Sequence, residues 1–236
     1  MALPKLEAAR YTTELPISKK KADYRPFLVK EQKILLQALE SEEGETVQNS
    51  LFDLIKSCTY NAEEIDLDHL SFTDIEWLFV QIRIKSAGET ADLLLNCDCS
   101  EEVKIPVTVD LRESYVKDGE NISSNIKLTE EIGINLSLPN LKSFSPTTTE
   151  INTNDMFDMI TSCIESIYDG DEVHTREDFN KKELMDFMET LSTEQFERIQ
   201  GFFENMPRLV NNISYDCNEC EKHHERELEG VSDFFG

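Results

Sequence analysis

The chain has 236 residues, of which 39% are hydrophobic and 13 are Phe, so it holds enough apolar material for one large or two small domains. Its formal net charge of −25 gives a surface that repels nucleic acid and anionic lipid, which argues against nucleic-acid binding. No segment approaches the ~20 apolar residues of a membrane span, and the first residues lack the basic start and apolar core of a secretory signal. We therefore expect a protein made and used in a cytosol, with no membrane contact.

The N-terminal region predicts a hairpin followed by a helix. Short strand-forming runs around a basic turn favour a hairpin over residues 11–27. In residues 29–39, Ile34 and Leu35 lie on an apolar helical stripe, and Glu31 lies on the polar side. This pattern predicts an amphipathic helix with Ile34 inside and Glu31 outside.

Two more helices and a second hairpin are expected before residue 110. Residues 47–58 carry a further apolar stripe, and Thr73 and Glu76 have the spacing of a capping box that opens the next helix. The strand-like runs at residues 91–95 and 103–109 then predict a hairpin with a cysteine pair at its tip.

The second part of the chain follows a similar order. Residues 132–138 alternate apolar and polar side chains, which indicates a half-buried strand. The elements expected after it are a linker over 143–154, helices over 155–167 and 179–191, a helix opened by a capping box at Ser192, and a hairpin from 213–216 and 225–228.

A repeated segment connects the two parts. Residues 156–163 (MFDMITSC) repeat residues 51–58 (LFDLIKSC), with conservative changes apart from Lys56 to Thr161. We therefore predict an α+β fold of two related halves, residues 1–115 and 116–236, each with a strand segment, amphipathic helices and a cysteine-tipped hairpin.

Four cysteines form the one constellation with a chemical role. Zinc binds four thiolates tetrahedrally, and a hairpin tip with Cys-x-x-Cys presents two of them. The candidate ligands of a structural zinc are Cys97, Cys99, Cys217 and Cys220, with His223 and His224 as substitutes. The single residue between Cys97 and Cys99 is tighter than the usual spacing, so metal-free reduced thiols are the alternative.

The sequence does not predict an enzyme. It lacks a phosphate-binding glycine loop, a Gly-x-Ser-x-Gly elbow and a His-Glu-x-x-His helix, and the segment that begins at Asp169 is an incomplete calcium loop. His69 and His174 stand alone, and the acidic clusters are expected as solvated surface. Cys58 and Cys163 lie on apolar helical stripes, where a thiol is a small core residue.

The last residues carry an unusual apolar pair. Phe234 and Phe235 are adjacent in the C-terminal segment, where aromatic residues are rare. Two interpretations follow: these rings pack on the protein's own helices, or they bind a partner.

Several segments together form a pattern that chance does not explain. They are residues 2–7 (ALPKLE), 24–36 (YRPFLVKEQKILL), 74–79 (DIEWLF), 85–89 (KSAGE) and 229–235 (EGVSDFF). In these segments the chain resembles the baseplate hub assembly proteins of T-even-type (T4-like) contractile-tailed bacteriophages, and the similarity runs from the first residues to the last.

The resemblance implies a role in viral tail morphogenesis, as a baseplate hub assembly factor or as an inner-baseplate structural protein. The implied partners are baseplate hub subunits and the tape-measure protein, and the implied places are the host cell cytoplasm during assembly and the virion tail baseplate. It implies no catalysis. The competing prediction is a zinc-ribbon-type regulatory adaptor that uses the thiol hairpins as its working surface.

Overall fold

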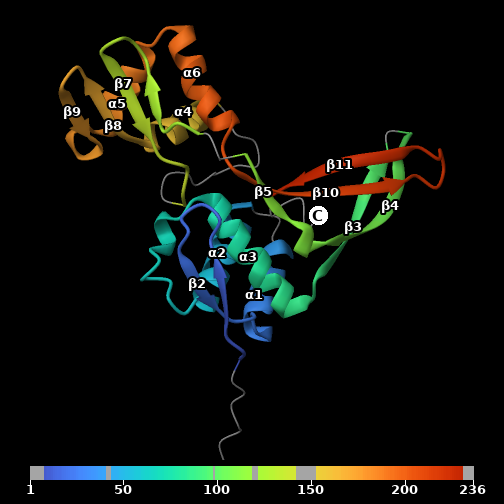
Figure 1. Ribbon diagram of the computed structural model, residues 1–236. Helices are drawn as coiled ribbons and strands as arrows, with labels where there is room; N and C mark the ends of the chain where they lie inside the picture. The colour runs from blue at the N-terminus through green and yellow to red at the C-terminus, as the bar shows by residue number, and fades with distance from the viewer. Residues whose placement is uncertain (1–7, 41–43, 98, 119–121, 142–152, 231–236) are drawn as a thin grey trace, which may run out of the picture. The chain divides into compact units, whose positions relative to one another are not determined.

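The computed structural model describes residues 8–40, 44–97, 99–118, 122–141 and 153–230. The chain forms two compact units (Figure 1). The first takes residues 1–67, 73–117 and 208–236, and the second takes residues 68–72 and 118–207, as far as these are described. Both contain helices and small antiparallel sheets, which confirms the predicted α+β class.

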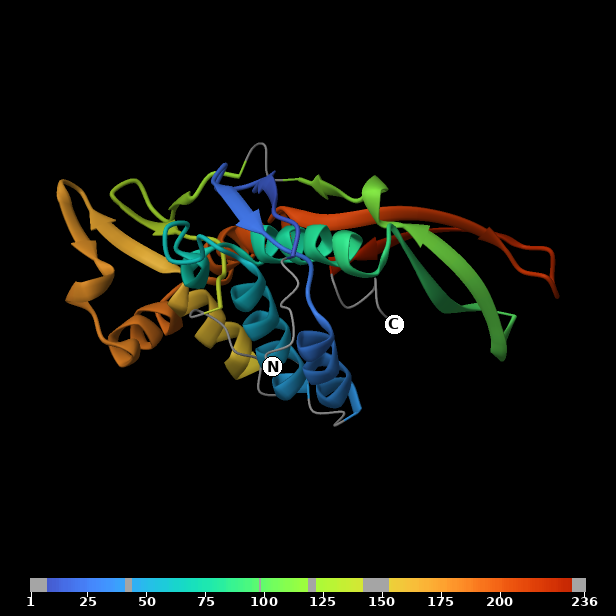
Figure 2. The same ribbon diagram turned by 90° about the horizontal axis from the view of Figure 1, so that it is seen from below.

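The first unit begins with the predicted hairpin and three helices. Strands β1 (Tyr11–Glu14) and β2 (Lys21–Tyr24) pair in antiparallel register. Helices α1 (Val29–Glu40) and α2 (Gly44–Cys58) lie side by side, as Figure 2 shows, and α3 (Phe72–Ala87) follows.

Helix α3 is buried on more than one side. Leu78 and Ile82, one turn apart, are both 0% exposed, and Val80 on another side is also 0% exposed. The helix begins at Phe72, one residue before the predicted capping box of Thr73 and Glu76. In its first turn, the buried carboxylate of Asp74 accepts hydrogen bonds from the backbone N–H groups of Ile17 and Ser18 in the β1–β2 loop.

Two hairpins of this unit share a hydrophobic core (Figure 1). Strands β3 (Thr90–Cys97) and β4 (Ser100–Asp110) form one, and β10 (Arg208–Asp216) and β11 (His223–Glu229) form the other, with β5 (Tyr115–Lys117) on the outer edge of β10. Side chains on β3 alternate strictly between exposed and buried. The shared core comprises Val80, Ile84, Ala91, Leu93, Leu95, Cys97, Ile105, Val107, Val109, Leu111, Leu209, Cys217 and Leu228.

The second unit is a four-stranded antiparallel sheet with three helices. The strand order is β6 (Asn125–Lys127), β7 (Ile132–Leu136), β8 (Ile164–Asp169) and β9 (Glu172–Thr175). The helices are α4 (Thr153–Ser162), α5 (Lys181–Glu189) and α6 (Thr193–Glu204), and α6 starts at the predicted capping box of Ser192. The core between sheet and helices is formed by Leu128, Ile134, Leu136, Ile160, Ile164, Ile167, Leu184, Met188, Ile199 and Phe202.

The helix predicted over residues 155–167 was wrong in its second part. Helix α4 ends at Ser162, and the next residues form β8 between β7 and β9. The β-branched residues Ile164 and Ile167 suit a central strand, and both side chains are buried. The linker predicted over residues 143–154 lies mostly outside the described residues, and Thr153 already belongs to α4.

The repeated segment makes the same backbone contact in both places. The carbonyl of Cys58 at the end of α2 accepts the N–H of Arg25 at 2.9 Å, and the carbonyl of Cys163 after α4 accepts the N–H of Ser137 at 2.8 Å. The division into halves at residues 115 and 116 stays a prediction about the origin of the chain. The compact units divide the sequence differently, because β10 and β11 belong to the first unit.

Candidate metal centre

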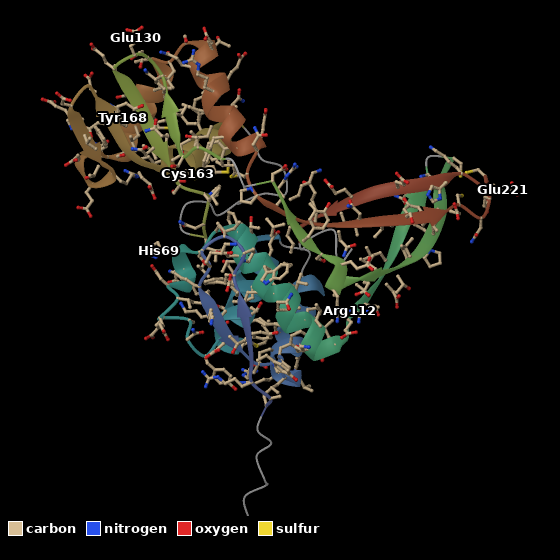
Figure 3. The ribbon with its side chains drawn as sticks, in the orientation of Figure 1. His69, Arg112, Glu130, Cys163, Tyr168 and Glu221 are labelled. Atoms are coloured by element: carbon tan, nitrogen blue, oxygen red, sulfur yellow. The ribbon has the colours of Figure 1, made fainter. Side chains whose placement is uncertain are left out.

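The two predicted cysteine hairpins meet at their tips. Cys97 ends β3 at a break in the strand register, and Cys99 lies in the turn before β4. Cys217 directly follows β10, and Cys220 lies in the turn before β11, beside Glu221, whose label marks this tip in Figure 3. Residues more than a hundred positions apart are thereby brought into contact.

The four sulfur atoms form one tight cluster. The Sγ atoms of Cys97 and Cys220 are 3.6 Å apart, and those of Cys99 and Cys217 are 3.8 Å apart. All four lie within 4.8 Å of one another. Cys97 and Cys217 are buried, whereas Cys99 and Cys220 face solvent, so the cluster lies at the end of the hairpin core.

The Cys217–Cys220 turn directs backbone N–H groups at the sulfurs. The N–H groups of Cys220 and Glu219 donate to the sulfur of Cys217, and the N–H of Lys222 donates to that of Cys220. Glu221 has a φ of 57°, in the left-handed region, which reverses the chain so that the N–H of Cys217 reaches the carbonyl of Lys222 at 3.0 Å. Such donors stabilise negative charge on sulfur.

The thiol pKa values follow from these contacts. The N–H groups of Cys220 and Glu219 lower the pKa of Cys217 to about 7. Hydrogen bonding to the sulfur of Cys97 is the main cause that raises the pKa of Cys99, to about 12. The cluster therefore combines a thiol that ionises readily with one that holds its proton against its neighbours.

His224 faces the cluster and His223 does not. The Nε2 atom of His224 is 3.2 Å from the Sγ of Cys97, and its ring stacks on Tyr215 at 5.0 Å between centroids. His223 instead places Nδ1 2.7 Å from the Asp216 carboxylate. Of the two histidines predicted as substitute ligands, only His224 has a contact with a cysteine sulfur.

The other sequence candidates lie elsewhere or outside the described residues. Cys58 and Cys163 are 1% and 0% exposed in the two units, which confirms them as core residues. His69 is exposed, and the incomplete calcium loop is the β8–β9 turn that carries Gly170. Phe234 and Phe235 lie outside the residues that the structure describes.

One feature of the site escaped the sequence analysis. Tyr215 and His224 are directly opposite in the β10–β11 register, which makes the stacked pair beside Cys97. The hairpin prediction gave the two strands but not their register. Counting residue pairs outward from the Cys217–Cys220 turn would have placed the two rings together.

Comparison with known proteins gives a family over nearly the whole chain. A family model described as T4 bacteriophage base plate protein matches residues 8–236. The baseplate hub assembly protein gp26 of Enterobacteria phage T4 is 24% identical over 226 residues, which cover 95% of this chain and 97% of that protein. No solved structure gives a significant match. These matches confirm the resemblance found in the sequence.

Proposed function

Because the chain belongs to the T4 bacteriophage base plate protein family, we propose that it acts in phage tail morphogenesis through protein–protein contacts, as a baseplate hub assembly factor or an inner-baseplate structural protein. The observation that carries the proposal is the end-to-end match to a protein named for baseplate hub assembly. A match of that extent favours this role over a zinc-ribbon-type regulatory adaptor. The family and the relative are named for structure and assembly, so no covalent catalysis is proposed.

Helix α1 supplies a surface for such contacts. Val29 is 81% exposed and Leu36 is 52% exposed, and the two lie a heptad apart on the same face, beside Leu28 at 43%. The same helix buries Glu31. The expectation that Ile34 lies inside and Glu31 outside was therefore wrong, since Ile34 is 54% exposed. A helix that shows aliphatic side chains to solvent and buries a carboxylate favours a partner on its outer face.

We propose that this surface, defined by Leu28, Val29 and Leu36, binds a baseplate hub subunit. The net charge of −25 would speed the encounter with a basic partner and disfavour wrong contacts between copies of the chain. No helix among the described residues is long and apolar enough to cross a membrane. We place the binding event in the host cell cytoplasm during assembly, with the tape-measure protein as a second candidate partner.

A capture experiment tests the proposal. The tagged protein, produced in infected cells, is expected to retain hub subunits, and the double variant Val29→Glu/Leu36→Glu is expected to lose them without a change in melting temperature. Val173→Glu is the matched control, because Val173 is 62% exposed in the other unit. Capture should also weaken as salt rises toward ~150 mM, where the Debye length falls to about 8 Å. Wild-type protein that retains no baseplate protein contradicts the proposed function.

The two forms of the role give different results in mature particles. A structural protein is present in purified tails, and an assembly factor is absent from them although it binds hub subunits in lysates. Removal of residues 231–236 in the same capture assay tests Phe234 and Phe235. Lost capture at an unchanged melting temperature supports a partner site, and a lower melting temperature supports packing on the protein itself.

A further inference from the structure

Two sulfur–sulfur distances in the cluster are close to the edge length of an occupied tetrahedral site, and all four sulfurs lie within 4.8 Å of one another. Four thiolates bound about 2.3 Å from a zinc ion lie about 3.8 Å from one another. The pairs Cys97–Cys220 and Cys99–Cys217 are separated by 3.6 Å and 3.8 Å. We propose that these four cysteines bind one zinc ion as thiolates, and that this ion joins the tips of the two hairpins. The proposal does not depend on the baseplate role.

The distances do not fit disulfides. A disulfide places its sulfurs about 2.05 Å apart, far closer than either pair in the cluster. Disulfide-bonded sulfurs are also neutral, so they would gain little from the backbone N–H groups that point at Cys217 and Cys220. Those donors suit sulfurs that carry negative charge, as metal-bound thiolates do. When the ion binds, the protons of the thiols pass to solvent.

Zinc is the ion that best suits this ligand set. Soft thiolates select zinc and other thiophilic metals over magnesium or calcium, and four of them complete a tetrahedral shell. No position stays open for water or substrate, so the ion is structural. It would link positions 118 and 123 residues apart in the chain, which constrains the unfolded chain far more than a local turn does.

His224 completes the site without being a ligand. Its Nε2 atom lies 3.2 Å from the Cys97 sulfur, which suits an N–H donor to a bound thiolate. Stacking on Tyr215 fixes the plane of the ring. The zinc and four thiolates together carry two negative charges, in a chain that is already strongly acidic, so a donor on the sulfur weakens the local repulsion. His224 is thus a positioning residue for the metal site.

Metal analysis tests the zinc ion directly. Protein purified with a reductant and without a chelator is expected to contain one zinc ion per chain, measured by inductively coupled plasma mass spectrometry. Its cobalt form should show thiolate-to-metal charge transfer and the intense visible bands of tetrahedral cobalt. Cys97→Ser and Cys217→Ser should lose the metal, and Cys163→Ala should keep it, since Cys163 lies in the other unit. A folded wild-type protein without metal, or one that holds iron instead, overturns the zinc assignment.

A pair of histidine variants tests the role of His224. His224→Phe keeps the stack on Tyr215 but removes the N–H donor, and we expect zinc affinity to fall about 10- to 100-fold in competition with a chelator. His224→Gln retains an N–H donor and should restore part of that loss. His223→Phe is the matched control, because His223 contacts Asp216 and not a sulfur. An unchanged affinity for His224→Phe contradicts the role, and this readout needs no binding partner.

Discussion

Glu31 shows how strongly a single buried carboxylate can organise its surroundings. It is 5% exposed and accepts hydrogen bonds from the Arg25 guanidinium at 2.9 Å and the Leu28 N–H at 2.7 Å, while the Lys30 ammonium lies at 3.1 Å. Burial raises the pKa of this carboxyl, but the hydrogen bonds from Arg25, Leu28 and Lys30 outweigh burial and lower it to about 2. The Leu28 bond also caps the first turn of α1.

Replacing Glu31 by Gln should lower the free energy of unfolding by about 2 kcal/mol at pH 7, because Arg25 loses its charged partner in a site where it is 12% exposed. Because folding lowers the pKa of this carboxyl, its ionised form stabilises the folded protein at pH values above the ordinary pKa of 4.5. This contribution disappears as the pH falls toward 2. The difference in the free energy of unfolding between wild type and variant, measured by urea titration, should therefore shrink below pH 4.5.

Glu64→Gln is the matched control for this prediction, since Glu64 is exposed. It should leave stability unchanged within about 0.5 kcal/mol at every pH. A Glu31→Gln difference that stays constant down to pH 3 would contradict the role of the charge.

At the scale of elements, the sheet of the second unit depends on one glycine. Gly133 in β7 is directly opposite Tyr168 in β8, and a Cβ atom at position 133 would overlap the Tyr168 ring. The ring of Tyr168, labelled in Figure 3, occupies the space that a side chain at position 133 would need, and its hydroxyl donates a hydrogen bond to Oδ1 of Asn125 at 3.1 Å. The ring thus covers the glycine and ties β6 to β8 across β7.

We expect Gly133→Ala to destabilise the protein by about 2 kcal/mol, because the ring must leave its place. The same substitution at Gly201, with open space around it in the interior of α6, should stabilise by up to about 1 kcal/mol, since alanine favours a helix. Urea denaturation of both variants and of Gly133→Ala/Tyr168→Ser checks this. Additive losses in the double variant would show that the two residues do not interact.

Local signals explain which elements the sequence revealed. The capping box at Ser192 and the strand-like runs on either side of Cys97 and Cys99 are short-range patterns, and both gave elements that the structure contains. The strand β8 was missed because an apolar run that follows a helix continues the helical pattern. Only its pairing with β7 and β9 makes this segment a strand. The burial of Glu31 was missed because it needs Arg25, which lies outside the helix.

The same distinction applies to the metal site. Each cysteine pair could be placed on a hairpin tip from nearby residues. That the two tips meet depends on β10 and β11 joining the core of the first unit, a long-range contact that no local pattern encodes. The role of His224 depends further on the strand register.

At the scale of the whole molecule, the first unit is discontinuous in sequence. Leu228 in β11 is 1% exposed and shares a core with Val80 in α3 and Leu93 in β3. The second unit has a separate core, in which Leu184 of α5 is 0% exposed. Cooperativity should follow these cores and not the order of residues along the chain.

Two leucine variants test this directly. Leu228→Ala should cost about 3 kcal/mol and lower hydrogen-exchange protection in α3, β3 and β10 together, although β3 precedes β11 by more than a hundred residues. Protection in β7, β8 and α6 should stay as in the wild type. Leu184→Ala, an equal truncation in the second core, should give the reverse pattern. If either variant lowers protection equally in both sets of strands, the chain unfolds as one cooperative body and the two cores do not act separately.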